Sequence, residues 1–467
     1  MTHKDYHSFL SEKLSFGMFD GVPVETVPDW LFPHQQDLVR WALRRGRSAI
    51  FADTGLGKTR MQLAWADAVT SHAGGDVLIL APLAVAEQTV EEGAAVGLRI
   101  TNCRSDDDVR PGINITNYER LHRFDASRFV GVVLDESSII KHETSKTLQL
   151  LLDAFSRTPF RLCATATPAP NDWTELGTHA EFLGVRSHTE MLCEFFVHDG
   201  GETQTWRLKK HARREFWRWV SSWGALIRSP SDLGHDDSAY QLPPLTVHQH
   251  TVESGVPFGQ LFAIEAQTLS DRRSARRESI AERVSACAEI VNASADIWLI
   301  WCELNAEGDA LRQAIPGAVE VRGSDSVEDK ERRLMDFAHG KTRVLISKPS
   351  ICGFGLNLQA CHNMAFVGVT DSWESYYQAV RRCWRFGQEH PVDVHIFCSE
   401  SEGAVVSNLA RKESAAKAMQ AELAAETLDS VRESVLGSSR ETNSYQPTAR
   451  IAIPEWIVTE QNMENAA

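Results

Sequence analysis

The sequence lacks the features that mark secreted, membrane-spanning and zinc-stabilised proteins. No apolar run approaches the length of a membrane span, and residues 1–10 have neither the basic start nor the apolar core of a signal peptide. The nine cysteines form no Cys-x-x-Cys pair and the histidines do not cluster, which argues against structural zinc and for a reducing compartment. We therefore expect a soluble intracellular protein with no membrane partner.

The composition is that of an ordinary globular protein. With 43% hydrophobic and 24% charged residues in 467, the chain should form two or three domains with enough core to fold without covalent staples. The net charge of −15 gives no sign of wholesale coating by nucleic acid, although local basic patches can bind it whatever the total charge. We expect a monomer, and the sequence indicates no particular protein partner.

One stretch, residues 52–60, organises the rest of the chain. It reads Ala-Asp-Thr-Gly-Leu-Gly-Lys-Thr-Arg, follows the apolar run 48–51 and leads into a helical pattern at 61–65. A strand, a glycine loop and a helix in this order can ring a phosphate with backbone amides, and the helix points its positive end at the same place. The residues expected to bind ATP here are Thr54, Gly55, Leu56, Gly57, Lys58, Thr59 and Arg60. Ala52 stands where the usual first glycine of such a loop would be.

An acid pair further along the chain supplies the expected partners of this loop. Lys58 would reach the β- and γ-phosphates, and the Thr59 hydroxyl would ligate Mg²⁺. The apolar run 132–134 ends in Asp135, expected to bind the same Mg²⁺, and in Glu136, expected to orient and deprotonate the attacking water. A plain glycine turn and a chance acid pair are the alternatives, and the order of the two motifs favours the phosphate site.

Short apolar segments alternate with helical patterns in two separate parts of the chain. The expected strands are 77–81, 113–116, 130–134 and 162–165, then 297–302, 319–321, 344–347, 364–369 and 394–398. Continuously apolar strands separated by helices indicate parallel sheets covered on both faces. The sequence therefore predicts an α/β fold with two domains built alike.

The segment between these two parts has another character. Residues 178–240 are rich in tryptophan and in basic residues: Trp206, Arg207, Lys209, Lys210, Arg213, Arg214, Trp217, Arg218, Trp219 and Trp223. Two interpretations of this segment stay open: a helical cover that buries its tryptophans, and a contact surface for nucleic acid. Both can hold at once. The prolines of 229–232 and 242–244 suggest a linker, and 269–285 suggests a helix with a solvated basic face.

Taken in order, the motifs resemble those of superfamily 2 helicases, with a DEAD/DEAH-box-like core, and among them the SWI/SNF-like translocases of double-stranded DNA. The matching segments, within residues 31–400, are Pro33-His34-Gln35, 135–138, Thr165-Ala166-Thr167-Pro168 with Asn171, 353–358 and 378–388. The resemblance implies two tandem RecA-like lobes with ATP in the cleft between them. Lobe 1 would span 31–240 with an insertion at 178–240, lobe 2 would span 241–437, and 1–30 and 438–467 would be a lead-in and an irregular tail.

The resemblance also implies roles for single residues. Gln35 would read adenine, while Gln378, Arg382 and Arg385 would be catalytic, the two arginines acting as fingers from lobe 2. Their spacing of four and then three residues predicts one helix face, and a surface helix with ion pairs is the alternative. The residues implied in coupling nucleotide to nucleic acid are Thr165, Thr167, Gly355 and Asn357.

Three positions depart from the family pattern. Ser138 stands where members often carry His or Gln, which bears on the coupling of ATP to DNA and not on hydrolysis. Cys352 replaces a glycine that the family prefers, and Arg381 replaces the glycine of the helicase pattern before Arg382.

The function implied is an ATP- and Mg²⁺-dependent translocase on nucleic acid, with DNA favoured over RNA. A strand-separating DNA or RNA helicase and a nucleotide-gated DNA-binding module with little turnover are the alternatives. The compact core resembles phage and bacterial translocases, so we expect a cytoplasmic protein, in the host's cytoplasm if the chain is phage-encoded.

Overall fold

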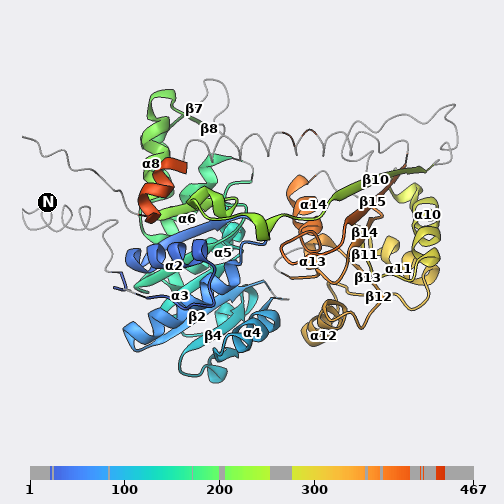
Figure 1. The fold of residues 1–467 in the computed structure, drawn as a ribbon, viewed down its shortest axis with the longest axis horizontal. Coiled ribbons are helices and arrows are strands. Elements are labelled where there is room, and N and C mark those ends of the chain that lie inside the picture. The colour runs from blue at the N-terminus through green and yellow to red at the C-terminus, as the bar shows by residue number, and fades with distance from the viewer. Residues whose placement is uncertain are drawn as a thin grey trace, which may run out of the picture. The chain divides into compact units, whose positions relative to one another are not determined.

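The fold consists of two parallel sheets, each covered by helices (Figure 1). A computed structural model describes residues 21–436, apart from 24–25, 83–84, 171, 199–205, 253–275, 353–355, 369–371, 400–410, 412–413 and 415–427. Asn171, Gly355 and the tail 438–467 therefore lie outside the described residues, as do residues 1–20. The predicted architecture of two RecA-like lobes is confirmed.

Lobe 1 is built on a seven-stranded sheet in the order β3-β4-β2-β5-β6-β1-β9, all of its pairings parallel. Its elements are α2 (Pro33–Arg45), β1 (Arg47–Ala52), α3 (Lys58–Ala73), β2 (Asp76–Ala81), α4 (Ala86–Ala95), β3 (Ile100–Asn102), β4 (Ile113–Asn117), β5 (Phe129–Asp135), α5 (Lys146–Ala154), β6 (Phe160–Ala164), α6 (Leu176–Leu183), α7 (His188–Phe195), β7 (Phe196–His198), β8 (Trp206–Leu208), α8 (Arg213–Trp223) and β9 (Gly224–Ile227). The pair β7–β8 forms a separate antiparallel ribbon.

Lobe 2 is built on a six-stranded sheet in the order β10-β15-β14-β11-β13-β12, again parallel throughout. Its elements are β10 (Leu245–Val252), α10 (Ile280–Ala293), β11 (Trp298–Trp301), α11 (Asn305–Ala314), β12 (Val319–Glu320), α12 (Val327–Ala338), β13 (Val344–Ser347), α13 (Pro349–Cys352), β14 (Asn363–Phe366), α14 (Trp373–Val380) and β15 (Val392–Ser399).

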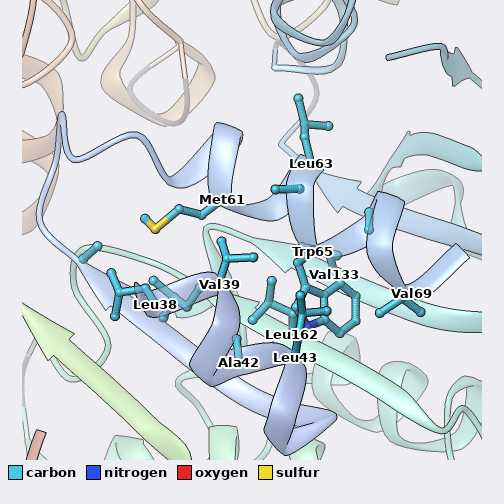
Figure 2. Packing of buried hydrophobic residues seen from close by; sticks show 14 of the residues in the cluster. Leu38, Val39, Ala42, Leu43, Met61, Leu63, Trp65, Val69, Val133 and Leu162 are labelled. Atoms are coloured by element: carbon cyan, nitrogen blue, oxygen red, sulfur yellow. The ribbon is translucent and has the colours of Figure 1, made fainter. Parts of the chain in front are cut away.

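Alternate residues of each strand enter different cores, because successive side chains of a strand point to opposite faces. In β1, Ile50 belongs to the core under α2 and α3, whereas Ala49 and Phe51 belong to the core under α6 and α8. Figure 2 shows Leu38 and Val39 of α2 packing with side chains of α3, such as Trp65, over the sheet. Both sheet faces are therefore apolar, which explains the continuous apolar runs in the sequence.

Three strands of the two parallel sheets were not predicted, and neither was the β7–β8 ribbon. β3 and β9 have three and four residues, too few to give a periodic pattern, and β10 alternates between half-buried and exposed positions. β9 pairs with β1 beside the phosphate loop, so the insertion rejoins the sheet. The helix predicted over 269–285 lies partly outside the described residues, and α10 continues to Ala293.

The tryptophan-rich segment covers one face of the lobe 1 sheet. Trp217 and Trp223 are 2% exposed and belong to the core with Phe51, whereas Arg214 and Arg218 on α8 are exposed. The packing alternative therefore holds for these tryptophans, and the basic side chains remain at the surface.

The end of the described chain returns to lobe 1. Residues 428–436 are helical, and Val431 and Val435 join the lobe 1 core. Trp41 Nε1 donates to Ser434 Oγ at 2.9 Å. The range 241–437 expected for lobe 2 thus includes a terminal segment that packs on lobe 1.

Candidate functional site

The glycine loop joins β1 to α3 in the way that a phosphate site requires. Gly55 and Gly57 have φ of +91° and +79°, the left-handed region that glycine favours. A Cβ on Gly57 would lie 2.2 Å from Gln35 Nε2, and a Cβ on Gly55 would lie 3.0 Å from the backbone nitrogen of Phe386. The loop therefore depends on both glycines, one for packing within lobe 1 and one for contact with lobe 2.

Lys58 and Thr59 occupy the first turn of α3, directly after the loop. Lys58 Nζ donates to the carbonyl of Ala52 at 3.0 Å and to that of Asp53 at 3.4 Å. Burial lowers the pKa of Lys58, and the carboxylate of Glu136 opposes this shift. An ammonium with this cost of burial is well placed to gain from a bound anion.

The acid pair ends β5, as predicted, and is held by residues the sequence did not single out. Gln62 Nε2 of α3 donates to Asp135 Oδ1 at 2.6 Å, and the Tyr118 hydroxyl donates to the Asp135 carbonyl at 2.7 Å. Burial, with the charge of Glu136 adding to it, raises the pKa of Asp135 to about 6. Glu136 has φ of +51°, the only positive value at a described non-glycine residue, and such backbone strain clusters at functional sites.

A ring of polar contacts joins the two lobes behind Glu136. Thr165 Oγ1 donates to Glu136 Oε2 at 3.4 Å and accepts from the Thr167 amide at 3.2 Å. Gln378 Nε2 of α14 donates to Thr167 Oγ1 at 3.4 Å. Arg382 Nη2 donates to Gln378 Oε1 at 2.6 Å and lies 3.8 Å from Glu136 Oε1. Three sequence motifs from two lobes thus meet at one carboxylate.

The prediction that residues 378, 382 and 385 share a helix face is wrong. α14 ends at Val380, and Arg382 and Arg385 lie in the tight turns that follow. Gln388, 7% exposed, ties these turns to the segment before β14, since its Nε2 donates to the carbonyls of Gln359, Cys361 and Cys383. In these turns both arginines line the same pocket as the glycine loop of lobe 1.

Arg382 is a buried cation and Arg385 a half-buried one. Burial lowers the pKa of Arg382, opposed by Glu136, and burial together with the charge of Arg382 lowers the pKa of Arg385 to about 10. Arg385 Nη1 donates to the Leu356 carbonyl at 3.3 Å. Two adjacent guanidinium groups in one pocket favour a ligand with several negative charges.

Aromatic rings also line the pocket. Tyr240, from the segment between the lobes, stacks on Phe386 with centroids 4.7 Å apart, and Phe32 lies 6.1 Å from Phe386. The Tyr240 hydroxyl is buried, and within the described residues it has no hydrogen-bond partner. Burial raises the pKa of Tyr240 to about 12, so the hydroxyl keeps its proton to donate.

Gln35, expected to read adenine, is fully engaged with backbone in this structure. Its Oε1 accepts from the Phe32 amide at 3.0 Å, and its Nε2 donates to the Leu56 carbonyl at 2.9 Å. Gln35 therefore ties the start of α2 to the phosphate loop. Its role as reader stays a prediction.

One pocket of about 350 Å³ collects most of the predicted site. Its lining includes Gln35, Thr54, Gly55, Gly57, Lys58, Thr59, Arg60, Asp135, Glu136, Asn357, Arg382 and Arg385. Leu56 is buried in the core, and Gln378, Thr165 and Thr167 lie behind Glu136. The structure also adds Glu92, Tyr240 and Phe386 to the lining, and Gln88 joins Asn357 in a reciprocal backbone contact between lobes.

The residues present fit ATP and Mg²⁺. The buried Thr54 hydroxyl has no partner among the described residues, and the cations Lys58 and Arg385 border the same pocket. No group of three His, Cys, Asp or Glu gathers into a metal site within the described part of the chain. Mg²⁺ in nucleotide sites takes only one or two protein oxygens, with phosphates and water as its other ligands, so Thr59 and Asp135 match its needs.

Two family models match this chain. The SNF2-related domain matches residues 34–222, and the helicase conserved C-terminal domain matches residues 287–387. The chain belongs to the SNF2-like helicases of superfamily 2. The two matches fall on the two lobes of this SNF2-like helicase. The first runs from α2 to α8, and the second runs from α10 to the turns at 381–387 that carry Arg382 and Arg385, which we call the arginine turn. A search of curated proteins finds no match.

Two further properties bear on the opening expectations. None of the helices in the described ranges is long and apolar enough to cross a membrane. All nine cysteines are within the described residues and none of them forms a disulfide, with Cys193 the exposed one.

Two glutamines of the site were not singled out from the sequence. Gln62 and Gln88 are helix residues whose partners lie far along the chain, Asp135 and Asn357 respectively. Gln62 could have been found from its place one helical turn after Lys58, facing the loop.

Proposed function

We propose that this SNF2-like helicase hydrolyses ATP between its lobes and uses the lobe movement to travel along DNA, with double-stranded DNA preferred. The observation that supports this most is the position of Glu136, which lines the nucleotide pocket and also a second cavity. A carboxylate shared by two cavities can transmit the state of one to the other. The family resemblance favours duplex DNA as the occupant of the second cavity.

The second cavity offers several donors suited to a phosphate backbone. It measures about 650 Å³, and both lobes contribute hydroxyl and ammonium groups to its lining, from Ser138, Lys141, Lys330, Ser350 and Ser375, beside the carboxylates of Glu119 and Glu136. Hydroxyl and ammonium groups are the usual donors to phosphate oxygens, and such contacts carry no base-sequence information. Ser138, where family members often carry His or Gln, is part of this lining.

The proposed hydrolysis divides its work between the lobes. Lys58 and the N-terminus of α3 hold the phosphates, and Glu136 takes the proton of the attacking water. Thr59 and Asp135 would hold Mg²⁺, which supplies positive charge to the phosphates when bound. Arg382 and Arg385 stabilise the charge of the transferring phosphoryl group from lobe 2.

The coupling follows the ring around Glu136. Arg382 contacts Gln378, which contacts Thr167, and Thr167 leads back through Thr165 to Glu136. A change in charge at the γ-phosphate position alters the pull on Arg382 and hence on lobe 2. Repeated closing and opening of the lobes then moves them along the backbone.

The test is the ATPase rate with no nucleic acid, single-stranded DNA, double-stranded DNA and RNA in turn. We expect duplex DNA to give the largest stimulation, without strand displacement, and the affinity for DNA to fall steeply with added salt because phosphate contacts dominate. Displacement of a paired strand, or stimulation by RNA alone, would favour a strand-separating helicase. No turnover with any of the four would favour the nucleotide-gated binding module and overturn the proposal.

A further inference from the structure

Lobe 2 holds the phosphate loop directly through one carboxylate. Asp53 is the first loop residue after β1. Arg381 Nη2 donates to Asp53 Oδ2 and to the Thr54 carbonyl, each at 3.2 Å. The Tyr377 hydroxyl, one turn earlier in α14, donates to Asp53 Oδ1 at 3.0 Å. Three hydrogen bonds thus join the C-terminal end of α14 to the start of the loop.

The same carboxylate shapes the loop from inside. The Thr54 amide donates to Asp53 Oδ1 at 2.6 Å, so the position of the carboxylate sets the direction of the backbone entering the loop. The carbonyl of Asp53 accepts from Lys58 Nζ at 3.4 Å. A displacement of Asp53 therefore reaches both the loop backbone and the phosphate-binding lysine.

The ion pair between Asp53 and Arg381 is shielded from solvent, which strengthens it. The Arg381 side chain is 8% exposed and that of Asp53 is 29% exposed. The guanidinium carbon of Arg381 lies 5.1 Å from the ring centroid of Trp384 and 5.6 Å from that of Tyr377. A largely buried ion pair with further hydrogen bonds and ring contacts contributes more than an exposed pair.

Arg381 differs from its two neighbouring arginines. Arg382 and Arg385 line the nucleotide pocket, whereas neither Arg381 nor Asp53 is among its lining residues. The charge of Arg381 is balanced by Asp53, so Arg381 acts on the loop and not on the nucleotide. It is also the position where this chain carries arginine in place of the glycine of the helicase pattern, and a glycine has no side chain to make this contact.

We propose that Asp53, Arg381 and Tyr377 form a latch that keeps the lobes together before ATP binds and holds the phosphate loop ready for it. The latch rests on the proposed ATP site and makes Arg381 a positioning residue. If the closed arrangement is less populated, the apparent affinity for ATP falls in proportion, while the chemistry within the closed arrangement is unchanged.

The test is a double-mutant cycle with Asp53→Asn, Arg381→Gln and the double variant. Asparagine keeps an oxygen for the Thr54 amide and for Tyr377 but removes the charge, and the double variant leaves no unpaired buried charge, so folding is preserved in at least that arm. The exposed Arg214→Ala is the matched control. The readouts are the dissociation constant of a non-hydrolysable ATP analogue without nucleic acid, and KM and kcat for ATP.

We expect each single variant to weaken analogue binding and raise KM about tenfold, with kcat within about twofold of the parent. The double variant should be no weaker than either single one, because both remove the same contact. Additive losses, or unchanged affinity in all three variants, would overturn the latch. Analogue binding does not depend on turnover or DNA, so a failure of the proposed translocase would be seen separately, in the stimulation assay.

Discussion

The two lobes share an architecture but contribute to the site in opposite ways. Lobe 1 offers a loop between β1 and α3, a lysine in the first turn of α3, and an acid pair at the end of β5. Lobe 2 offers Arg382 and Arg385 on turns held by Gln388, with no comparable strand or helix beneath them. In the proposed hydrolysis, lobe 1 would bind the nucleotide and lobe 2 would add the cations that the reaction needs.

This difference suggests that one lobe serves nucleotide binding and the other serves the chemical step. A phosphate can be held by lobe 1 alone, because the loop amides, Lys58 and the α3 N-terminus are all local. In the proposed hydrolysis, the charge that builds up in the transition state would be met only with the arginines of lobe 2 in place. Substitutions in lobe 1 should therefore affect binding or chemistry according to position, and those in the arginine turn should affect turnover.

The largest effect is expected within lobe 1 itself. Lys58→Ala should abolish tight ATP binding, because it removes the cation between the β- and γ-phosphates. Glu136→Gln should keep binding but lower turnover by a factor of about a thousand, since the water loses its base. Fluorescent ATP-analogue binding and steady-state ATPase rates separate the two. Equally weak binding in both variants would contradict this division of roles.

The next largest effect is expected when the support of the arginine turn is removed. Gln388→Ala removes the hydrogen bonds that join the turn carbonyl of Cys383 to the carbonyls of Gln359 and Cys361 through one side chain, and it should lower kcat about a hundredfold by misplacing Arg385, with analogue affinity within about threefold. Gln149→Ala, on the exposed face of α5, is the control. A loss of binding equal to the loss of kcat would mean that the turn serves binding as well.

A smaller effect is expected at the aromatic end of the pocket. Phe386→Ala should weaken ATP binding about tenfold through lost stacking on the base. Inorganic tripolyphosphate, which has no base, should bind the variant and the parent equally. If both ligands weaken alike, Phe386 supports the loop at Gly55 and not the base.

The smallest effect concerns the stability of lobe 2. Burial raises the pKa of Glu303 to about 7, with Arg276 opposing the shift. A carboxyl with a raised folded pKa contributes stability below its unfolded pKa and loses it as pH rises through 7. Glu303→Gln should therefore raise Tm at pH 8 by a few degrees and have little effect at pH 5, whereas the exposed Glu289→Gln should do neither. A Tm gain that is the same at both pH values would contradict this.

The sequence predicted most of lobe 1 because its signals are local. The loop and the acid pair each lie at the end of an apolar strand, so a few adjacent residues carry the whole pattern. β9 escaped prediction because four residues buried on both faces have no periodicity, although it borders β1.

In lobe 2 the sequence pointed to Gln378, Arg382 and Arg385, but not to the turns on which the two arginines lie. The spacing of 378, 382 and 385 fits a helix, yet the chain turns after Val380 because Gln388 and contacts with lobe 1 stabilise a tighter course. The contact of Arg381 with Asp53 joins positions far apart in the sequence, and no periodicity reports such a pairing.

The most direct test of the shared site is the ATPase rate of Arg385→Ala and Arg385→Lys at saturating nucleic acid, alongside their affinity for an ATP analogue. We predict nearly unchanged affinity and a fall in turnover by a factor of about a thousand or more, with poor rescue by lysine because a point charge cannot reproduce the planar guanidinium. Turnover near the parent rate in Arg385→Ala would contradict an active site completed by lobe 2.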